Sequence, residues 1–360
     1  MGGVIYIINI IKTLNFLNDV EKPEILLFYK NDLKKYLDEI KYPYLTAIEW
    51  NFPSIVTGNI ISLFKRKNVF IDKILEDYSL DAIYPMHDFP VRTKTNVKLI
   101  GWCADLQHKH YPEFFSRLQI FSRNIRIKLG LINNDDLVLS SQDVLDDFYR
   151  YFKFNKNFRM HIFHFVSVIE DLDNVKFDDL KAKYNIPEKY FMVSNQFHKH
   201  KNHKVLFLAL ARLKEKGIIK HLAITGKFPR ASDSPYLAEL HDLIERFKLS
   251  DQITLLGLIS RNDQLQLMRH SQAVLQPSLF EGWSTVIEDA KSLQVPVVAS
   301  NLKVNIEQLG KGGVYFDPHN PEELASILED YPERNLSDMF YKSYSDRIKL
   351  AAKELLTIFK

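Results

Sequence analysis

The fold class follows from residues 276–300, QPSLFEGWSTVIEDAKSLQVPVVAS. The pattern predicts a short buried strand, a loop that carries Glu281 and Gly282, a helix, and a second buried strand. Thr285 and Glu288 fit a capping box with Thr285 as the N-cap, which would start the helix directly after the loop. A helix start offers backbone N–H groups to an anion, and a glycine lets the anion approach them. We therefore expect an anion site in this loop.

Short apolar runs alternate with helical stretches on the N-terminal side of this segment as well, which is typical of parallel βαβ units. Because ligands of open α/β sheets bind beyond the carboxyl ends of the strands, we expect the functional residues in loops that follow strands. The predicted strands are residues 25–28, 82–84, 97–102 and 137–140, then 190–194, 222–225, 253–256, 273–276, 297–299 and 314–316.

The chain of 360 residues is too long for one ordinary core, so we predict two α/β domains. Both are expected to be Rossmann-like and doubly wound, and to face each other across a cleft. The N-terminal domain is expected at residues 1–170 and the C-terminal domain at residues 180–340, with the acidic stretch 170–179 as linker. A last helix, at residues 341–360, could pack back on the N-terminal domain.

The composition is that of a soluble globular protein, with 46% apolar and 26% charged residues. A single cysteine, Cys103, excludes an intramolecular disulfide framework and fits a reducing compartment. The net charge of +3 gives no argument for nucleic acid. Residues 1–17 are apolar but lack the features of a signal peptide, so we predict a buried helix there. We expect a cytoplasmic protein with no nucleic-acid partner.

One segment, residues 116–134, is basic and apolar without an acidic residue. Its cations are Arg117, Arg123, Arg126 and Lys128. The pattern suits a helix that lies on anionic lipid headgroups, which would place the protein at the inner face of the membrane. It also suits an amphipathic helix whose apolar face packs against its own core. The sequence leaves both interpretations open.

Residues 276–300, together with GGVYFDPHNPEELASIL at residues 312–328, resemble the retaining GT-B glycosyltransferases of glycosyltransferase family 4. The family fingerprint has two glutamates that flank a glycine-containing loop, then a helix and a Pro-Val-Val-Ala-Ser strand. The resemblance extends over most of the chain. It implies a metal-independent enzyme without a cofactor, which moves a sugar from a nucleotide-diphosphate-sugar to a glycan or lipid-linked acceptor in surface polysaccharide synthesis.

The resemblance also implies roles for residues of the central loop. Glu281 would contact the sugar as a catalytic residue, and Glu288 would bind the ribose hydroxyls of the donor. Six residues separate the two glutamates here, whereas the family has seven. The plainer alternatives are a solvated Glu281 and a Glu288 that only caps its own helix. Four further residues would surround the diphosphate: Gly282, Trp283, Ser284 and Thr285.

A basic loop, NQFHKHKNH at residues 195–203, follows the predicted strand 190–194. By resemblance, Lys201 matches a lysine that holds the diphosphate and supports catalysis, while no arginine matches the family's second cation. Gln196 stands nearby and is included among the donor-binding residues. Three histidines of the loop could suggest a metal, but no cysteine and no HExxH pattern accompanies them, so we expect no metal.

A histidine after the predicted strand 97–102 is a candidate for contact with the transferred sugar. By resemblance we select His108, with His110 second, although a structural histidine in a turn fits equally. The turn that begins at Met1 resembles the family's glycine-rich turn after a first strand, and no strand precedes it in this sequence.

Two other functions stay open. One is a non-catalytic GT-B protein that binds a nucleotide or glycan. The other is a sugar-nucleotide epimerase or related enzyme on a doubly wound scaffold. No GxGxxG motif follows a predicted strand, which argues against a dinucleotide site of that kind. A DxD string, Asp171 to Asp173, lies in the expected linker and is interpreted as chance acidity.

Overall fold

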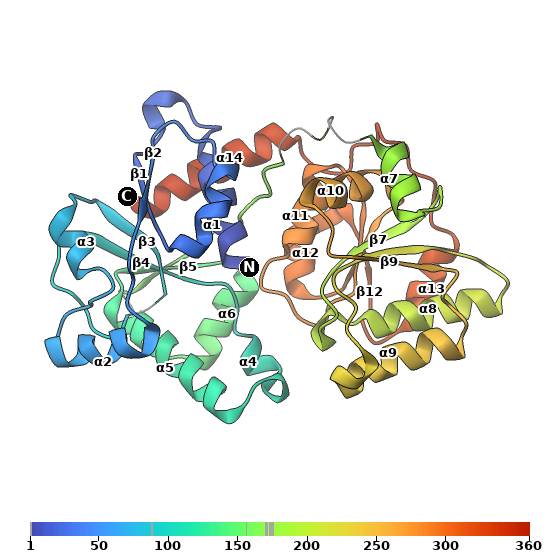
Figure 1. The fold of residues 1–360 in the computed structure, drawn as a ribbon, viewed down its shortest axis with the longest axis horizontal. Helices are drawn as coiled ribbons and strands as arrows, with labels where there is room; N and C mark the ends of the chain where they lie inside the picture. The colour runs from blue at the N-terminus through green and yellow to red at the C-terminus, as the bar shows by residue number, and fades with distance from the viewer. Residues whose placement is uncertain (1, 88, 156, 170–171, 173–175) are drawn as a thin grey trace. The chain divides into compact units, whose positions relative to one another are not determined.

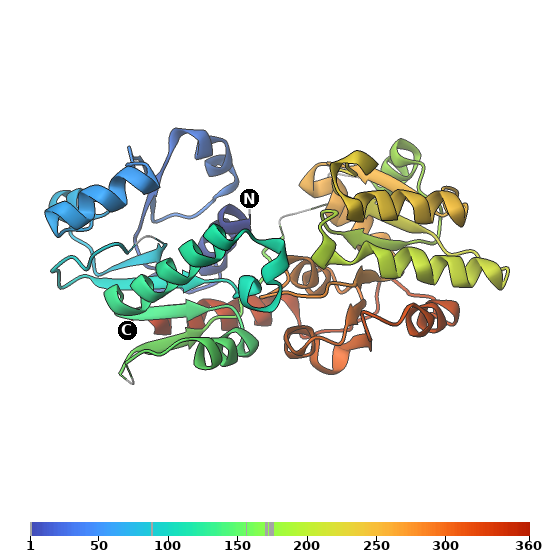
Figure 2. The same cartoon turned by 90° about the horizontal axis from the view of Figure 1, so that it is seen from below.

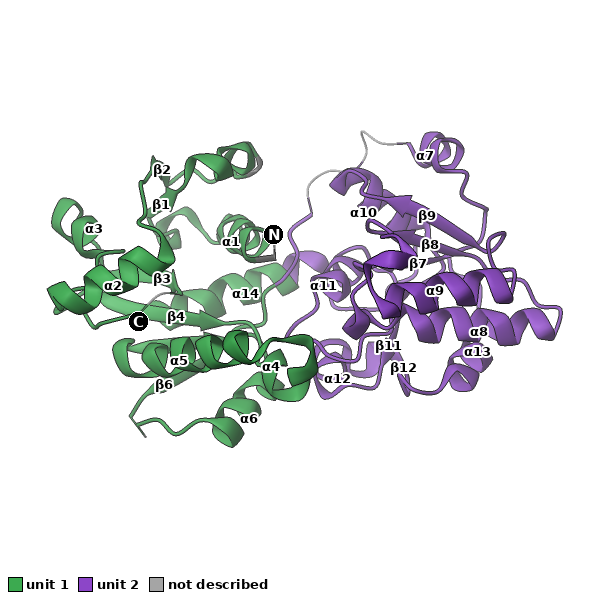
Figure 3. Cartoon of the chain, turned by 60° about the horizontal axis from the view of Figure 1, so that its bottom comes forward, with its two compact units in different colours: residues 1–165, 347–360 green, residues 166–346 purple. Residues whose placement is uncertain are grey.

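The computed structural model describes residues 2–87, 89–155, 157–169, 172 and 176–360. It divides into two compact units (Figure 3). Unit 1 comprises Met1–Phe165 and Arg347–Lys360, and unit 2 comprises Val166–Asp346. The strands of each unit pair in parallel and have helices beside them (Figure 1). None of the described helices is long and apolar enough to cross a membrane.

Unit 2 is built on one six-stranded sheet in the order β12-β11-β10-β7-β8-β9, with every pair parallel. All six strands predicted for this half are confirmed, with ends that move by at most one residue. Their bounds are β7 (Phe191–Ser194), β8 (Leu222–Thr225), β9 (Ile253–Gly257), β10 (Val274–Gln276), β11 (Val297–Ser300) and β12 (Gly313–Phe316).

The sheet of unit 2 is covered on both faces, which explains why its strands are apolar runs rather than alternating patterns. Phe191 and Val193 of β7 belong to one buried cluster, while Tyr190 and Met192 belong to another. Successive residues of a strand point to opposite faces, so the two clusters lie on opposite sides. The helices are α7 (Phe177–Tyr184), α8 (His203–Glu215), α9 (Pro235–Arg246), α10 (Arg261–His270), α11 (Thr285–Ser292), α12 (Lys303–Leu309) and α13 (Pro321–Glu329).

Unit 1 holds a four-stranded parallel sheet in the order β3-β4-β5-β6 and a separate parallel pair, β1 and β2. Four of these strands were predicted. The other two, β2 and β6, are only partly buried and include polar residues, so they lack the apolar run that signals a strand. The bounds are β1 (Ile25–Tyr29), β2 (Leu45–Glu49), β3 (Ala82–Met86), β4 (Lys98–Cys103), β5 (Asp136–Leu139) and β6 (Arg159–Ile162).

Helices lie on both sides of the four-stranded sheet, with α1 and α14 on one side and α2 and α5 on the other (Figures 1 and 2). The buried N-terminal helix is confirmed: Tyr6 of α1 stacks on Trp102 with ring centroids 4.1 Å apart. The helices are α1 (Gly2–Leu14), α2 (Ile55–Lys65), α3 (Asp72–Asp77), α4 (Gln107–His110), α5 (Arg117–Asn133), α6 (Gln142–Tyr151) and α14 (Tyr344–Phe359).

Two sequence expectations need correction. Residues 177–179 are the start of α7 rather than linker, and residues 170, 171 and 173–175, including both carboxylates of the DxD string, lie outside the described residues. The predicted last helix, α14, begins at Tyr344 rather than at residue 341, and its Leu350 is exposed because it faces away from the buried Ile348 and Ala351.

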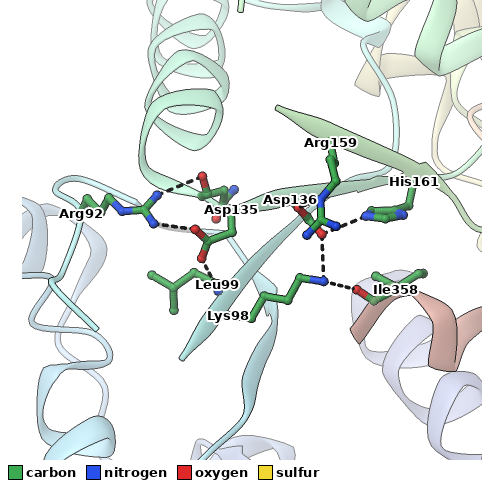
Figure 4. A network of polar contacts seen from close by, with 9 residues as sticks. Arg92, Lys98, Leu99, Asp135, Asp136, Arg159, His161 and Ile358 are labelled. Atoms are coloured by element: carbon green, nitrogen blue, oxygen red, sulfur yellow. Dashed lines mark hydrogen bonds and ion pairs between the residues drawn. The ribbon is translucent and has the colours of Figure 1, made fainter. Parts of the chain in front are cut away.

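Asp136, at the start of β5, joins α14 to the sheet of unit 1 (Figure 4). Its buried carboxylate accepts hydrogen bonds from Arg159 and His161, both at 2.9 Å. It also pairs with Lys98 at 3.0 Å, whose ammonium donates to the Ile358 carbonyl at 2.7 Å. Burial alone would raise the pKa of Asp136, but hydrogen bonds from His161, Lys98 and Arg159 lower it below its ordinary value.

Candidate active site

The strand order of unit 2 contains one topological switch point, between β7 and β10. From β7 the chain continues outward through β8 and β9, then returns to β10 beside β7 and continues outward in the other direction. The loops after β7 and β10 therefore leave the same sheet edge in opposite directions, and such a crevice is where open α/β sheets bind ligands. These two loops carry Lys201 and Glu281.

Hydrogen bonds tie the two loops together. The Leu279 amide donates to the His200 carbonyl at 2.7 Å. The Asn202 side chain donates to the carbonyl of Pro277 at 3.1 Å, and Asn195 donates to the Gln276 side chain at 2.9 Å. The loops therefore form one preorganised structure at the carboxyl edge of the sheet.

An ion pair lies where the loops meet. The Lys201 ammonium is 2.6 Å from Oε1 of Glu281, and the Gln276 amide donates to the same oxygen at 2.7 Å. The Glu281 side chain is largely buried, with an exposed fraction of 9%, and the Lys201 side chain is exposed to 19%. An ammonium has three N–H donors, so Lys201 can bind a phosphate oxygen while it keeps this ion pair.

Helix α11 begins after the loop, but its N-cap is Ser284 rather than the predicted Thr285. The Ser284 hydroxyl accepts a hydrogen bond from the Ile287 amide at 3.3 Å, so Glu288 is one residue too late for a capping box. Both residues at the boundary, Ser284 and Thr285, are good caps, and the sequence does not distinguish them. The Ser284 amide itself donates to the Gln308 side chain at 3.1 Å.

Glu288 lies buried beneath the helix start. Its Oε1 accepts hydrogen bonds from Gln308 at 2.9 Å and from Lys291 at 3.1 Å. Neither partner is predicted from the sequence. The contact with Lys291 could have been predicted, because residues three apart on a helix lie on one face. No sequence pattern indicates the contact with Gln308, since this residue belongs to α12, the helix after the next strand.

The remaining predicted donor-binding residues lie around the same loops. Gly282 is buried, Trp283 and Thr285 are half-buried, and Gln196 is exposed in the loop after β7. The Lys291 ammonium lies 5.9 Å from the centre of the Trp283 ring. Unit 2 thus brings together eight predicted residues on two neighbouring loops and the first turn of α11: Gln196, Lys201, Glu281, Gly282, Trp283, Ser284, Thr285 and Glu288.

The basic loop holds two neutral histidines. Burial, assisted by the Lys201 charge, lowers the pKa of His200 to about 4 and that of His203 to about 3. His203 stacks on Phe197 with ring centroids 4.2 Å apart, so it is a packing residue. Across the described ranges, no three His, Cys, Asp or Glu side chains are grouped so that they could hold a metal ion.

His108 is the predicted site residue that belongs to unit 1. It is buried in α4, with its Nε2 3.1 Å from the Asn124 side-chain oxygen, and burial lowers its pKa. The alternative candidate, His110, is more exposed and its Nε2 lies 2.6 Å from the Asp147 carboxylate. The placement of His108 near a transferred sugar stays a prediction.

The chain is similar to known glycosyltransferases. Residues 176–349 match the family described as Glycosyl transferases group 1. An uncharacterized glycosyltransferase of Methanocaldococcus jannaschii, MJ1059, is 23% identical over an alignment of 318 residues that covers 78% of this chain and 75% of that protein.

A second relative comes from Campylobacter jejuni. It is N-acetylgalactosamine-N,N'-diacetylbacillosaminyl-diphospho-undecaprenol 4-alpha-N-acetylgalactosaminyltransferase, 25% identical over 226 residues, 61% of this chain and 56% of that protein. Among solved structures, Anabaena HepE in complex with UDP and glucose superposes with a TM-score of 0.62 at 17% identity, covering 100% of this chain and 91% of that one.

Proposed function

We propose that this glycosyltransferase, which has the GT-B fold and a glycosyl transferases group 1 domain at residues 176–349, is a retaining enzyme that uses a nucleoside-diphosphate sugar. The observation that carries the proposal is the meeting of Lys201 and Glu281 at the switch point of the unit 2 sheet. A cation, a carboxylate and a helix start on joined loops suit a ligand that has a diphosphate, a sugar and a ribose.

The diphosphate is the part of the donor that needs positive charge. Lys201 supplies an ammonium, and the amides of Thr285 and Val286 precede the first intrahelical bond of α11, which runs from the Glu288 amide to the Ser284 carbonyl. The Ser284 amide, already bonded to Gln308, is less suited to this role. Lys201 and the start of α11 would therefore hold the phosphates.

Two carboxylates would orient the rest of the donor. Glu281, fixed by Lys201 and Gln276, would accept hydrogen bonds from the sugar hydroxyls. Glu288 would accept from the ribose hydroxyls, with its carboxylate held in place by Gln308 and Lys291, which both donate to Oε1.

The proposed reaction breaks the bond between the anomeric carbon and the diphosphate oxygen. The acceptor hydroxyl attacks on the face that the diphosphate leaves, and an oxygen of the leaving diphosphate takes the hydroxyl proton, so the anomeric configuration is retained. The protein contributes positioning and stabilises the charge that develops on the diphosphate. We propose that no metal ion is required.

The acceptor is proposed to be a glycan or a lipid-linked sugar of a surface polysaccharide, made on the cytoplasmic side of the membrane. The Campylobacter relative, whose name specifies a diphospho-undecaprenol acceptor, supports this acceptor class. UDP and glucose in the HepE complex support a nucleotide-sugar as donor.

A transfer assay with a panel of nucleotide-sugars and lipid-linked acceptors tests the proposal. Lys201→Met should lower kcat by about 10²–10³, as expected for loss of one charge-stabilising donor. Lys199→Met, an exposed lysine of the same loop, should stay near the wild type. The product should keep the donor's anomeric configuration by NMR, and EDTA should leave the rate unchanged. Donor binding without transfer to any acceptor would instead support a non-catalytic protein.

A further inference from the structure

Helix α2 buries its small residues and exposes its large apolar ones. Gly58 and Ser62 face the protein: a Cβ on Gly58 would lie 2.4 Å from the Phe70 ring, and the Ser62 hydroxyl accepts a hydrogen bond from the Val69 amide at 3.1 Å. A helix that only covers its own core has the opposite distribution. The exposed apolar side chains are Ile55, Val56, Ile60, Leu63 and Phe64, whose exposed fractions run from 49% for Ile60 to 85% for Phe64.

Helix α5 has a similar surface. Its buried residues, Gly130, Leu131 and Asn133, all belong to its C-terminal end. Four large apolar side chains are exposed along the helix: Leu118, Phe121, Ile125 and Ile132. Of the two interpretations of residues 116–134, packing against the core therefore holds for one side of the helix, through Ile127 and Leu131, and leaves these four side chains exposed.

The same two segments concentrate the positive charge of the chain. Residues 51–71 and 114–134 contain no acidic residue. Together they carry seven of the basic residues: Lys65, Arg66, Lys67, Arg117, Arg123, Arg126 and Lys128. Because the whole chain has a net charge of +3, the rest of the chain is negative. Lys67 is paired with Asp72 and Glu76 of α3, at 3.4 and 3.8 Å. A surface that combines exposed apolar side chains with an excess of cations is complementary to anionic lipid headgroups.

We propose that α2 and α5 form a docking surface for an anionic lipid bilayer. Both helices lie on the same side of the four-stranded sheet of unit 1, away from α1 and α14 (Figures 1 and 2). Phe64 and Leu63 would enter the acyl boundary, while Lys65 and Arg66 would contact the headgroups. The proposal concerns unit 1 alone and does not depend on the sugar transfer assigned to unit 2.

A second copy of the chain fits this surface poorly. A two-fold dimer places the same patch of both subunits in contact, so the cations of α2 and α5 would face their own counterparts. Like charges brought together across an interface are strongly unfavourable. An anionic bilayer instead offers negative headgroups to the cations and, next to them, an apolar acyl region to the exposed apolar side chains.

Co-sedimentation with vesicles tests the proposal. The full chain should bind phosphatidylcholine vesicles that contain phosphatidylglycerol and should not bind pure phosphatidylcholine. Phe64→Ser/Lys65→Gln/Arg66→Gln should weaken binding at least about 20-fold, since each cation near an anionic surface contributes roughly fivefold. The matched control is Lys349→Gln/Leu350→Ser/Lys353→Gln, which removes two cations and an exposed apolar residue from α14 and should bind like the wild type.

Insertion is read separately by quenching with brominated lipid. A tryptophan at Phe64→Trp should be quenched in anionic vesicles, and one at Leu350→Trp should not. The proposal is overturned if the wild type does not bind anionic vesicles or if the triple variant of α2 binds them as tightly as the wild type. It is also overturned if the triple variants of α2 and α14 lose binding equally. A dimer in gel filtration that the α2 variant dissociates would assign this surface to a second copy instead.

Discussion

Replacing Gln308 by leucine should markedly lower the free energy of unfolding of unit 2. This buried side chain of α12 makes three hydrogen bonds to the start of α11. It accepts from the Ser284 amide at 3.1 Å, and it donates to the Ser284 carbonyl and to Glu288, both at 2.9 Å. Leucine has a similar size but can make none of these bonds, so three buried polar groups each lose a partner.

The magnitude follows from the nature of the three partners. A neutral hydrogen bond contributes about 1 kcal/mol, and one to a charged group about 1.5–3 kcal/mol. Two bonds to Ser284 and one to the Glu288 carboxylate therefore predict a loss of about 4 kcal/mol in the free energy of unfolding. The loss should appear together with weaker donor binding, because the helix start that would hold the diphosphate is released.

Urea unfolding followed by Trp283 fluorescence measures this loss. Unit 2 contains one tryptophan, so a Trp50→Phe/Trp102→Phe background isolates its signal. Asn262→Leu, which removes an exposed amide of α10, is the control and should change stability by less than about 0.5 kcal/mol. A Gln308→Leu loss no larger than that of the control would refute the reasoning.

Three further results are expected. His200 and His203 have folded pKa values of about 4 and 3, below the ordinary 6.5, so the unfolded chain binds more protons than the folded one at mildly acidic pH. Acidification from pH 8 to 5 should therefore lower the free energy of unfolding of unit 2 by about 2 kcal/mol per histidine. His203→Phe should make the urea midpoint depend less on pH. Asp136→Asn should destabilise unit 1 by about 3–5 kcal/mol near neutral pH, with less effect as acid protonates the wild-type carboxylate, and amide exchange in α14 should speed up. Phe64→Ser should leave the free energy of unfolding within about 0.5 kcal/mol, because this side chain is largely exposed; a larger loss would place it in the core.

The sequence predicts most of unit 2 because its strands are buried on both faces. Runs such as residues 297–299 are apolar without interruption, and such runs between helical stretches leave little ambiguity. Strands β2 and β6 were missed because they are partly exposed and include polar residues, so they do not form an uninterrupted apolar run.

The site was less predictable than the fold. The resemblance of their motifs makes Glu281 and Lys201 candidate site residues, but neither motif reveals that they pair with each other. Gln276 and Gln308 orient the two glutamates, yet each looks like any other glutamine until the sheet places it. Contacts between residues far apart in sequence depend on tertiary structure, which local patterns do not encode.

The central claim is that the joined loops after β7 and β10 hold a nucleoside diphosphate. Isothermal titration of a panel of nucleoside diphosphates into the wild type, Lys201→Met and Lys199→Met tests it most directly. We predict that at least one diphosphate binds the wild type and Lys199→Met alike and loses at least tenfold in affinity for Lys201→Met. Equal affinity for all three proteins, or no binding of any diphosphate, would contradict the account.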